Sequence, residues 1–234
     1  MKKTLWIAMV GALAASVVAA SAQEVLSANA VGYIKKTVPA GGKIVTVALP
    51  LDSMTDTNNV FGRTSVAQEA LAGSYVWFWN EASQGWVGGI KRAGVLAWSP
   101  GQSNYVVKAG EGFFLRSPTN SATAMDVTIT GEVPSDASLQ RTIIGNDNIG
   151  VLANAYPVDF KFGESDVAKN ATAGSYVWFW NETSQGWIGG IKRAGLLAWS
   201  PGQSNYVVKA GEGFFLKEKS TVNVWTAAKP YTWP

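Results

Sequence analysis

The sequence contains no cysteine and no histidine, and each absence excludes a class of chemistry. Without cysteine the fold is held by its hydrophobic core and not by disulfides. Without histidine there is no imidazole base, no Ser-His or Cys-His nucleophile, and no ordinary zinc, copper or non-haem iron site. We therefore expect no metal and no cofactor, and only carboxylates, Lys, Tyr, Ser and Thr remain as candidates for catalysis.

The chain also lacks a strong charge of either sign. It has 19 basic and 16 acidic residues, and two of the lysines, Lys2 and Lys3, fall in the N-terminal segment described next, which leaves 17 against 16. No basic stripe and no RNP-type motif is present. We therefore expect no nucleic-acid partner.

A long apolar run occurs only near the N-terminus. Lys2 and Lys3 precede the apolar stretch 5–20, and Ala20-Ser21-Ala22 forms a small-x-small cleavage site. This pattern predicts a signal peptide over 1–22, a mature chain from Gln23, and export to the periplasm, the outer surface or the medium. The alternative is an uncleaved N-terminal anchor. No later segment resembles a transmembrane helix, so we expect no membrane span after signal removal.

An internal repeat dominates the rest of the chain. Residues 72–115 match residues 173–216 at an offset of 101, with 41 of 44 positions identical. The match extends back to Phe61-Gly62 and Phe162-Gly163. Further upstream Pro50-Leu51-Asp52 resembles Pro157-Val158-Asp159, and on that alignment the first copy carries six more residues. Such self-similarity predicts two copies of one structural unit.

A cluster of turn-forming residues at 133–138 marks the boundary between the copies. It predicts one unit over 24–133 and a second over 134–234; the alternative is one continuous sandwich with strands exchanged between the halves. Some identical pairs look solvent-facing, namely Ser83/Ser184, Gln84/Gln185, Lys91/Lys192, Arg92/Arg193 and Gln102/Gln203. Either the duplication is recent, or both copies present the same surface.

Alternating apolar and polar residues, rich in aromatic and β-branched side chains, predict strands throughout the chain. The expected strands are 31–35, 43–49, 74–79, 86–91, 104–108, 113–116 and 125–130, then 139–144, 150–155, 175–180, 187–192, 205–209, 214–217 and 222–226. Only 65–71 and 166–172 look helical, with a capping box at Ser65-x-x-Gln68. The sequence thus predicts an all-β protein, a tandem duplication of a small antiparallel sandwich or barrel-like unit with at most one short helix per copy.

The most distinctive segment, Tyr-Val-Trp-Phe-Trp-Asn, occurs once in each copy, at 75–80 and 176–181. In a strand its Tyr and two Trp residues share one face, about 6.6–6.8 Å apart, and flat rings in a row suit the apolar faces of sugars. The alternative is that these rings fill a core. The predicted ligand-binding residues are Tyr75, Trp77, Trp79 and Trp86 with their counterparts Tyr176, Trp178, Trp180 and Trp187, and Trp98 and Trp199 would extend the surface.

Carboxylates offer little for catalysis. A glycosidase needs two of them flanking one bond, and the repeated block supplies only Glu81 and Glu111, then Glu182 and Glu212, all in predicted turns. We expect Glu111 and Glu212, which lie between glycines, to be solvated turn residues. No catalytic residue is predicted, and the spacing of the acidic residues near Asp52 does not match a calcium-binding loop.

Several motifs resemble those of a group of uncharacterised exported bacterial β-repeat proteins. These motifs are Val31-Gly32-Tyr33-Ile34, the turn at 39–41, Ala-Gly-Glu-Gly-Phe-Phe at 109–114, and Trp225-Thr226 followed by Lys-Pro-Tyr at 229–231. The resemblance implies export and the all-β class, and it transfers no activity and no site residue.

Together these patterns predict a non-catalytic secreted or cell-envelope protein that binds a polysaccharide or cell-surface glycan through its aromatic strand faces. The alternative is a structural or surface-layer component that self-associates through its faces or edges. A carbohydrate-active enzyme is a third alternative.

Overall fold

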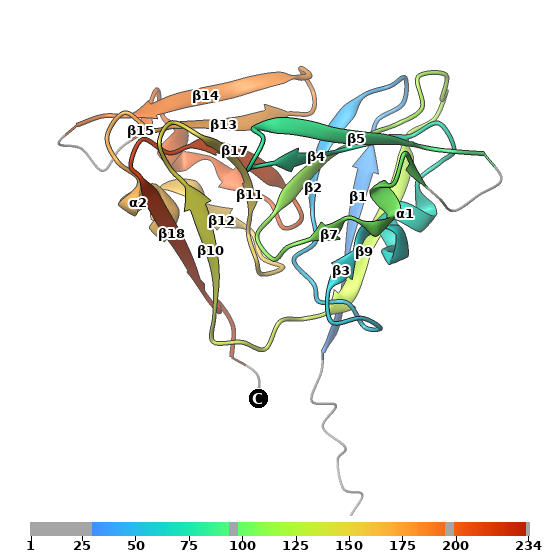
Figure 1. Cartoon of the computed structure of the whole chain (residues 1–234), viewed down its shortest axis with the longest axis horizontal. Coiled ribbons are helices and arrows are strands. Elements are labelled where there is room, and N and C mark those ends of the chain that lie inside the picture. Colours follow the sequence, from blue (N-terminus) through green and yellow to red (C-terminus); the bar gives the residue numbers. More distant parts are fainter. Residues whose placement is uncertain (1–29, 94–97, 195–198, 233–234) are drawn as a thin grey trace, which may run out of the picture.

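The structure is a computed structural model that describes residues 30–93, 98–194 and 199–232, with only the backbone of Val222. The predicted signal peptide, 1–22, lies outside the described residues. Strands are the main regular structure of the described chain, with two short helices, and the strands build two similar halves side by side (Figure 1). The all-β class and the tandem duplication are confirmed.

Both halves contain the same elements in the same order. The first half comprises β1 (Val31–Val38), β2 (Ile44–Ala48), β3 (Asn59–Val60), η1 (Phe61–Arg63), α1 (Ser65–Glu69), β4 (Tyr75–Asn80), β5 (Gly85–Lys91), β6 (Trp98–Ser99), η2 (Gln102–Asn104), β7 (Val106–Val107), β8 (Gly112–Arg116) and β9 (Met125–Glu132). The second comprises β10 (Ser138–Ile144), β11 (Ile149–Ala153), β12 (Phe160–Lys161), η3 (Phe162–Glu164), α2 (Asp166–Asn170), β13 (Tyr176–Asn181), β14 (Gly186–Lys192), β15 (Trp199–Ser200), η4 (Gln203–Asn205), β16 (Val207–Val208), β17 (Gly213–Lys217) and β18 (Val222–Ala228).

Each half is sandwich-like. A five-stranded antiparallel sheet, in the order β2-β8-β4-β5-β6 or β11-β17-β13-β14-β15, accompanies a two-stranded ribbon, β1-β9 or β10-β18. A smaller pair, β3-β7 or β12-β16, completes each half. All the described sheets stay within one half, and only an isolated bridge, Glu111 with Leu152, joins strand-like backbone across them.

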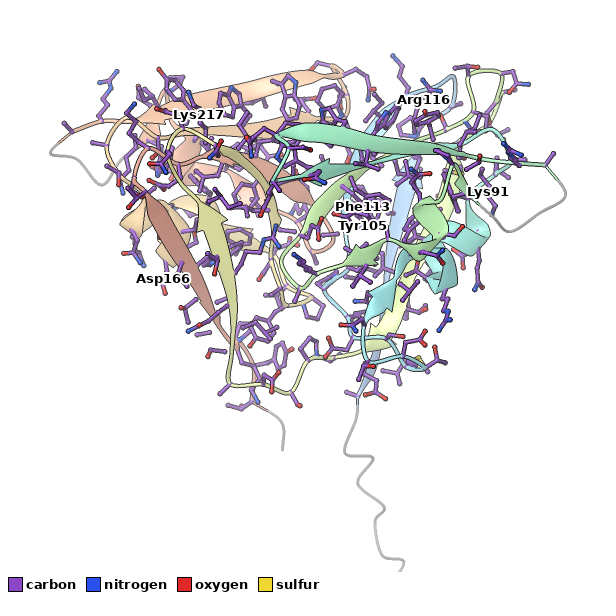
Figure 2. The ribbon with its side chains drawn as sticks, in the orientation of Figure 1. Lys91, Tyr105, Phe113, Arg116, Asp166 and Lys217 are labelled. Carbon is purple, nitrogen blue, oxygen red and sulfur yellow. The ribbon has the colours of Figure 1, made fainter. Side chains whose placement is uncertain are left out.

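One hydrophobic core lies inside each half. In the first, Val76 and Phe78 of β4 pack with Phe113 of β8 and Ile129 of β9, all fully or almost fully buried. Figure 2 shows Phe113 and Tyr105 together in the interior of this half. The alternation of buried and partly buried residues along β4 follows from the period of two in a strand, as the sequence predicted.

The short helix α1 is held at both ends by side chains. Thr64, and not Ser65 as predicted, is its N-cap and accepts a hydrogen bond from the Ala67 N–H. At the other end the Lys91 ammonium donates to the carbonyls of Ala67 and Gln68, at 2.8 and 2.6 Å. Lys91 is therefore buried, although it looked solvent-facing in the sequence, because helix-end carbonyls need donors. Lys192 does the same for α2.

Gln102 and Gln203 are also buried, contrary to their polar appearance. The Gln102 side chain accepts from the Gly101 N–H, and the Gln203 side chain donates to the Gly189 carbonyl. Packing thus accounts for their identity in the two copies. Within the described residues, neither helix has the length and apolarity to cross a membrane.

A pseudo-two-fold axis relates the halves, because residues on it meet their own counterparts. The rings of Phe114 and Phe215 stack across it with centroids 5.7 Å apart. Gly112 and Gly213 meet backbone to backbone, and a Cβ added to Gly112 would lie 2.9 Å from the Gly213 Cα. Such self-pairing is the mark of an isologous interface.

Reciprocal hydrogen bonds flank this axis. The Gln84 amide accepts from the Ile149 N–H at 2.7 Å and donates to its carbonyl, and the Gln185 amide bonds Ile44 in the same way, with its acceptor bond also 2.7 Å. Ion pairs lie further out, Arg141 with Glu81 and Lys36 with Glu182. The Gln84/Gln185 pair, predicted as solvent-facing, therefore lies in the interface between the halves.

These contacts correct the alignment of the early strands. Ala48 donates to Gly211 and Ala153 donates to Gly110, so equivalent residues differ by 105 before the loop that follows β2 or β11, and by 101 from the end of that loop to β8 or β17. The first half therefore carries four extra residues, not six. Pro50 corresponds to Ala155 and not to Pro157.

Candidate functional site

The aromatic segments form β4 and β13, as predicted. In β4 the side chains of Tyr75, Trp77 and Trp79 share one partly buried face, and Val76 and Phe78 point into the core. The sequence left open whether the aromatic face is covered or exposed. The structure shows that the other half covers one end of this face and leaves the other end accessible.

Trp79 and Trp180 form the covered end. The Trp79 indole N–H donates to the Ile149 carbonyl at 2.7 Å, and the Trp180 indole N–H donates to the Ile44 carbonyl at 2.9 Å. Both rings pack partly buried against the Phe114 and Phe215 pair. The expectation of an unbroken row of rings facing water is therefore wrong at these two positions, because the indoles join the halves.

Trp86 and Trp187 lie at the rim of this interface. In the register of the hairpins Trp86 is opposite Trp79 and Trp187 is opposite Trp180. Trp86 contacts the rings of Phe114 and Phe215 at 5.2 and 5.6 Å, yet it is 41% exposed, and Trp187 is 46% exposed. These two indoles combine a packed side with a side that faces solvent.

The accessible end of each face depends on a glycine in the neighbouring strand. Trp77 is opposite Gly88, and a Cβ on Gly88 would lie 2.5 Å from the Trp77 Cδ1. Trp178 has the same relation to Gly189, also at 2.5 Å. Each indole leans across the space that a larger residue would fill, so the glycines make room for this ring position.

The second half has a hollow of about 370 Å³ at this end. Its lining consists of Tyr176, Trp178, Trp187, Gly189, Gly190, Ile191, Ser200 and Pro201. The rings of Tyr176 and Trp178 are nearly parallel, at 12°, with centroids 5.7 Å apart. Three of the four predicted ligand-binding residues of this copy thus line one depression.

The first half differs at one position. Arg116 places its guanidinium carbon 5.3 Å from the ring centres of both Tyr75 and Trp77, a cation–π arrangement. Lys217 is its counterpart (Figure 2) and pairs with Asp147 at 3.2 Å. Tyr75 and Trp77 are also closer, at 4.5 Å and 35°. Among the described residues, a cation therefore lies over the aromatic face in the first half and not in the second.

Trp98 and Trp199, expected to extend the surface, are core residues. Each is 2% exposed and donates its indole N–H to a carbonyl of the short helix, Ala67 or Ala168. They cannot contact a ligand at the surface.

Glu111 and Glu212 are buried, so the prediction of solvated turn residues is wrong. Glu111 accepts from the Tyr105 hydroxyl at 2.5 Å and from the Lys108 N–H at 3.0 Å. Glu212 accepts from Tyr206 and from the Lys209 N–H in the same way. Burial raises the pKa of both carboxyl groups. The two glutamates close their own turns.

The structure also brings Glu81 and Glu111 to one crevice, of about 280 Å³, together with Tyr105, Lys108 and Arg141. Glu81 is paired with Arg141 at 2.6 Å. Both oxygens of Glu111 accept hydrogen bonds from residues of its own turn, Tyr105 and Lys108. Among the described residues, no group of three acidic side chains is placed to hold a metal ion.

No protein-family model matches the chain, and no curated protein or solved structure matches it. The candidate site therefore rests on geometry alone. The sequence patterns did not predict the interface between the halves. One signal for it was present, because Gln84 and Gln185 are identical in polar turns where packing within one half would not require identity.

Proposed function

We propose that this is an exported, non-catalytic binding protein that contacts a glycan through two related aromatic sites. The first site comprises Tyr75, Trp77 and Trp86, and the second comprises Tyr176, Trp178 and Trp187. The hollow of about 370 Å³ at the second site carries the proposal, because it is shallow, lined by three rings and bounded by glycine backbone.

Sugar rings present C–H groups on their faces and hydroxyls at their edges. Flat indole and phenol rings match the faces, and nearby hydroxyl or charged groups such as Ser200 and Arg116 match the edges. The pseudo-two-fold axis fixes both sites in one body. A repetitive polysaccharide that reaches both sites would bind more tightly than a single repeat unit, because the second contact becomes intramolecular.

The test is a titration of the protein with a panel of neutral and acidic polysaccharides, followed by tryptophan fluorescence and calorimetry. Trp77→Ala combined with Trp178→Ala should abolish binding, since truncation of a stacking aromatic ring in a binding site costs about 2 kcal/mol or more. Tyr33→Ala is the matched control, because Tyr33 is an exposed ring outside both sites. Binding that survives the double substitution would contradict the proposal.

An enzyme is distinguished by its products. Glu111→Gln and Glu212→Gln should leave glycan binding unchanged, and reducing ends should not accumulate with the native protein. Release of product that disappears in either variant would replace the binding proposal with a catalytic one.

Self-assembly is a second candidate, and it has its own observation. Val31 and Tyr33 on β1 are 63% and 78% exposed, an apolar pair outside both glycan sites. Sedimentation without ligand tests this candidate directly. Oligomers that dissociate in Tyr33→Lys while glycan binding persists would show that the two functions use different surfaces.

A further inference from the structure

The two aromatic sites contain the same rings but differ in charge. In the first half Arg116 of β8 is opposite Tyr75 of β4, and its guanidinium carbon lies 5.3 Å from the ring centres of both Tyr75 and Trp77. In the second half, by contrast, no charged side chain lines the hollow among the described residues. The two sites therefore present different chemistry to a ligand.

The Arg116 guanidinium has no anionic partner. Within the part of the chain that the structure describes, Arg116 forms no hydrogen bond and no ion pair, and its Nε is buried without an acceptor. The two terminal nitrogens lack an acceptor as well but, unlike Nε, they are not buried. Because most polar groups that are partly buried find a partner in the folded chain, these unused donors point to an acceptor from outside the protein.

The rings hold the guanidinium in a position suited to a carboxylate. A cation–π contact uses the positive charge of Arg116 and not its N–H donors. The guanidinium is planar and always charged, and its paired N–H groups match the two oxygens of a carboxylate. Contact with Tyr75 and Trp77 restricts the side chain before a ligand arrives, so little conformational freedom is lost on binding.

The equivalent cation of the second half is already neutralised. Lys217 is opposite Tyr176, and its ammonium pairs with Asp147 at 3.2 Å. Asp147 lies in the turn before β11, at the position that Gly42 occupies before β2. Both residues have positive φ, 64° for Asp147 and 73° for Gly42, so the turns share this conformation. The carboxylate that holds the cation in the second half is therefore missing from the first.

Trp86 and Arg116 lie within reach of one ligand. The centre of the Trp86 ring is 5.2 Å from that of Phe114, and Arg116 is two residues beyond Phe114 on the same face of β8, about 6.6–6.8 Å further along the strand. Trp86 is 41% exposed. A sugar ring on the solvent side of this indole would therefore lie beside the guanidinium.

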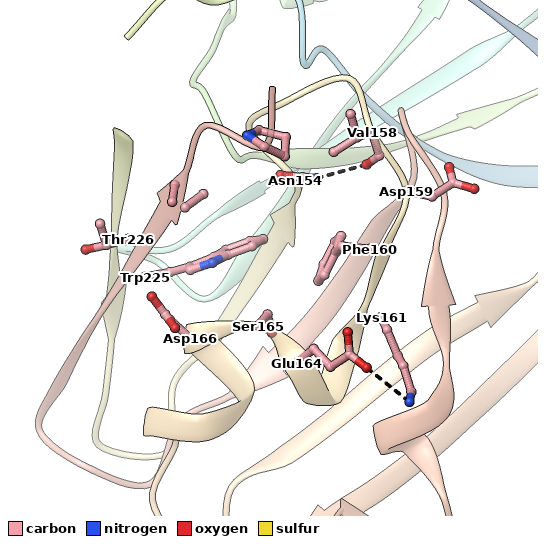
Figure 3. A pocket seen from close by; sticks show the side chains of 13 residues that line it. Asn154, Val158, Asp159, Phe160, Lys161, Glu164, Ser165, Asp166, Trp225 and Thr226 are labelled. Atoms are coloured by element: carbon pink, nitrogen blue, oxygen red, sulfur yellow. Dashed lines mark hydrogen bonds and ion pairs between the residues drawn. The ribbon is translucent and has the colours of Figure 1, made fainter. Parts of the chain in front are cut away.

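The other large hollow of the second half has the opposite charge. This hollow, of about 400 Å³, is shown in Figure 3 and contains the carboxylates of Asp159, Glu164 and Asp166. Asp159 pairs with Lys209 and Glu164 with Lys161, which leaves three carboxylates against two lysines. Because like charges repel, an acidic sugar is not attracted to this hollow and does not compete there with the Arg116 site.

We infer that the first aromatic site is specific for an acidic sugar, namely a uronic acid. The uronate carboxylate accepts hydrogen bonds from the Arg116 guanidinium while the sugar ring stacks on Trp86. The second site, whose hollow has no charged lining, has no preference for an acid. This inference rests on the proposed glycan-binding function and adds the class of sugar that each site takes.

The test compares free uronic acids with their neutral methyl esters, which keep the same ring. Tetramers of galacturonate and of mannuronate, and the methyl esters of both, are titrated by calorimetry into the full-length Trp178→Ala variant, where only the first site is intact. At least one free acid should bind about tenfold more tightly than its ester. Equal affinity of acid and ester for both sugars, or no binding of either acid, would overturn the inference.

Arg116→Met in the same background tests the guanidinium itself. Methionine keeps an apolar stem against the rings, so the affinity for the acid should fall to that of its ester while the affinity for the ester stays unchanged. Arg92→Met is the matched control, because it removes the same charge from an exposed position outside both sites. An equal loss in the two variants would assign the effect to net charge and contradict the inference.

Asp147→Gly gives the second half the residue of the first, and glycine suits the positive φ at this position. In the Trp77→Ala background, where only the second site is intact, this change frees Lys217 and should create a preference for the acid over its ester. An unchanged preference would contradict the inference. If neutral polysaccharides bind the native protein while acids and esters bind alike, the proposed function stands and only the acidic specificity fails.

Discussion

The two halves differ at their outer edges and agree where they touch. In the first half, Ser65 and Glu69 of α1 hydrogen-bond the outer backbone of β9, whereas among the described residues Asp166 and Asn170 of α2 make no hydrogen bond to β18. At the interface, by contrast, the hydrogen bonds of Gln84 and Trp79 are repeated across the axis by those of Gln185 and Trp180. A residue near the axis contacts the opposite half, so a change there alters the interface that both copies form. A residue at the outer edge contacts only its own half, and its identity can differ between the copies.

This comparison partly explains the near-identity of the repeated block. Gln84, Lys91 and Gln102 all looked solvent-facing, yet they bond the opposite half, the short helix and the neighbouring turn. Packing therefore maintains them in both copies. Ser83 and Arg92 are exposed, and no contact in the structure explains their identity with Ser184 and Arg193.

The largest expected effect comes from removing a ring on the axis. Phe114→Ala should lower the free energy of unfolding by about 3–5 kcal/mol, the usual cost of deleting a buried phenylalanine ring. Phe215→Ala should cost the same within about 0.5 kcal/mol, because the two rings are equivalent. Urea unfolding measures both, with Tyr33→Ala as an exposed control that should change little. Unequal costs for the two phenylalanines would show that the halves are not related as described.

A smaller effect is expected where the backbones meet. Gly112→Ala places a Cβ 2.9 Å from the Gly213 Cα, and such overpacking costs about 1–3 kcal/mol. Gly85→Ala is the matched control, because its Cβ would meet nothing closer than 3.7 Å. Equal stability of the two variants in urea would mean that the contact between the glycines is not close.

Particular residues show which parts of the fold can be predicted from the sequence. Alternation predicted β4 and its buried Val76 and Phe78, because the strand period is local. The two-residue strands β3 and β6 were missed, since they are too short to show a period. The covering of the Trp79 indole and the burial of Glu111 were not predicted, for another reason. The Trp79 indole bonds Ile149 of the other half, 70 positions away. Glu111 is bonded by residues near it in the sequence, but its backbone forms a bridge with Leu152 of the other half.

The indole hydrogen bonds across the interface give the next prediction. Trp79→Phe keeps most of the ring but removes the donor to the Ile149 carbonyl, which should cost about 1 kcal/mol. Trp180→Phe should match it. Trp86→Phe is the control, because the structure shows no hydrogen bond from its indole among the described residues. A cost for Trp86→Phe equal to that of Trp79→Phe would assign the effect to ring volume.

The smallest effect concerns pH, and it tests whether the buried glutamates are equivalent. Burial raises the pKa of Glu111 and Glu212 above the ordinary value of 4.5. The unfolded chain therefore releases these protons first, so the folded state is favoured below pH 4.5 and loses stability as the pH rises through the raised pKa. Asp159, whose pKa the Lys209 hydrogen bond lowers, contributes to the pH dependence of stability with the opposite sign.

The difference in stability between the native protein and a variant isolates the contribution of each glutamate. Glu111→Gln cannot ionise, so its stability should fall less between pH 4 and pH 8, and Glu212→Gln should show the same reduction. Urea unfolding across this range measures both slopes, and a reduction in only one variant would show that the two buried glutamates are not equivalent.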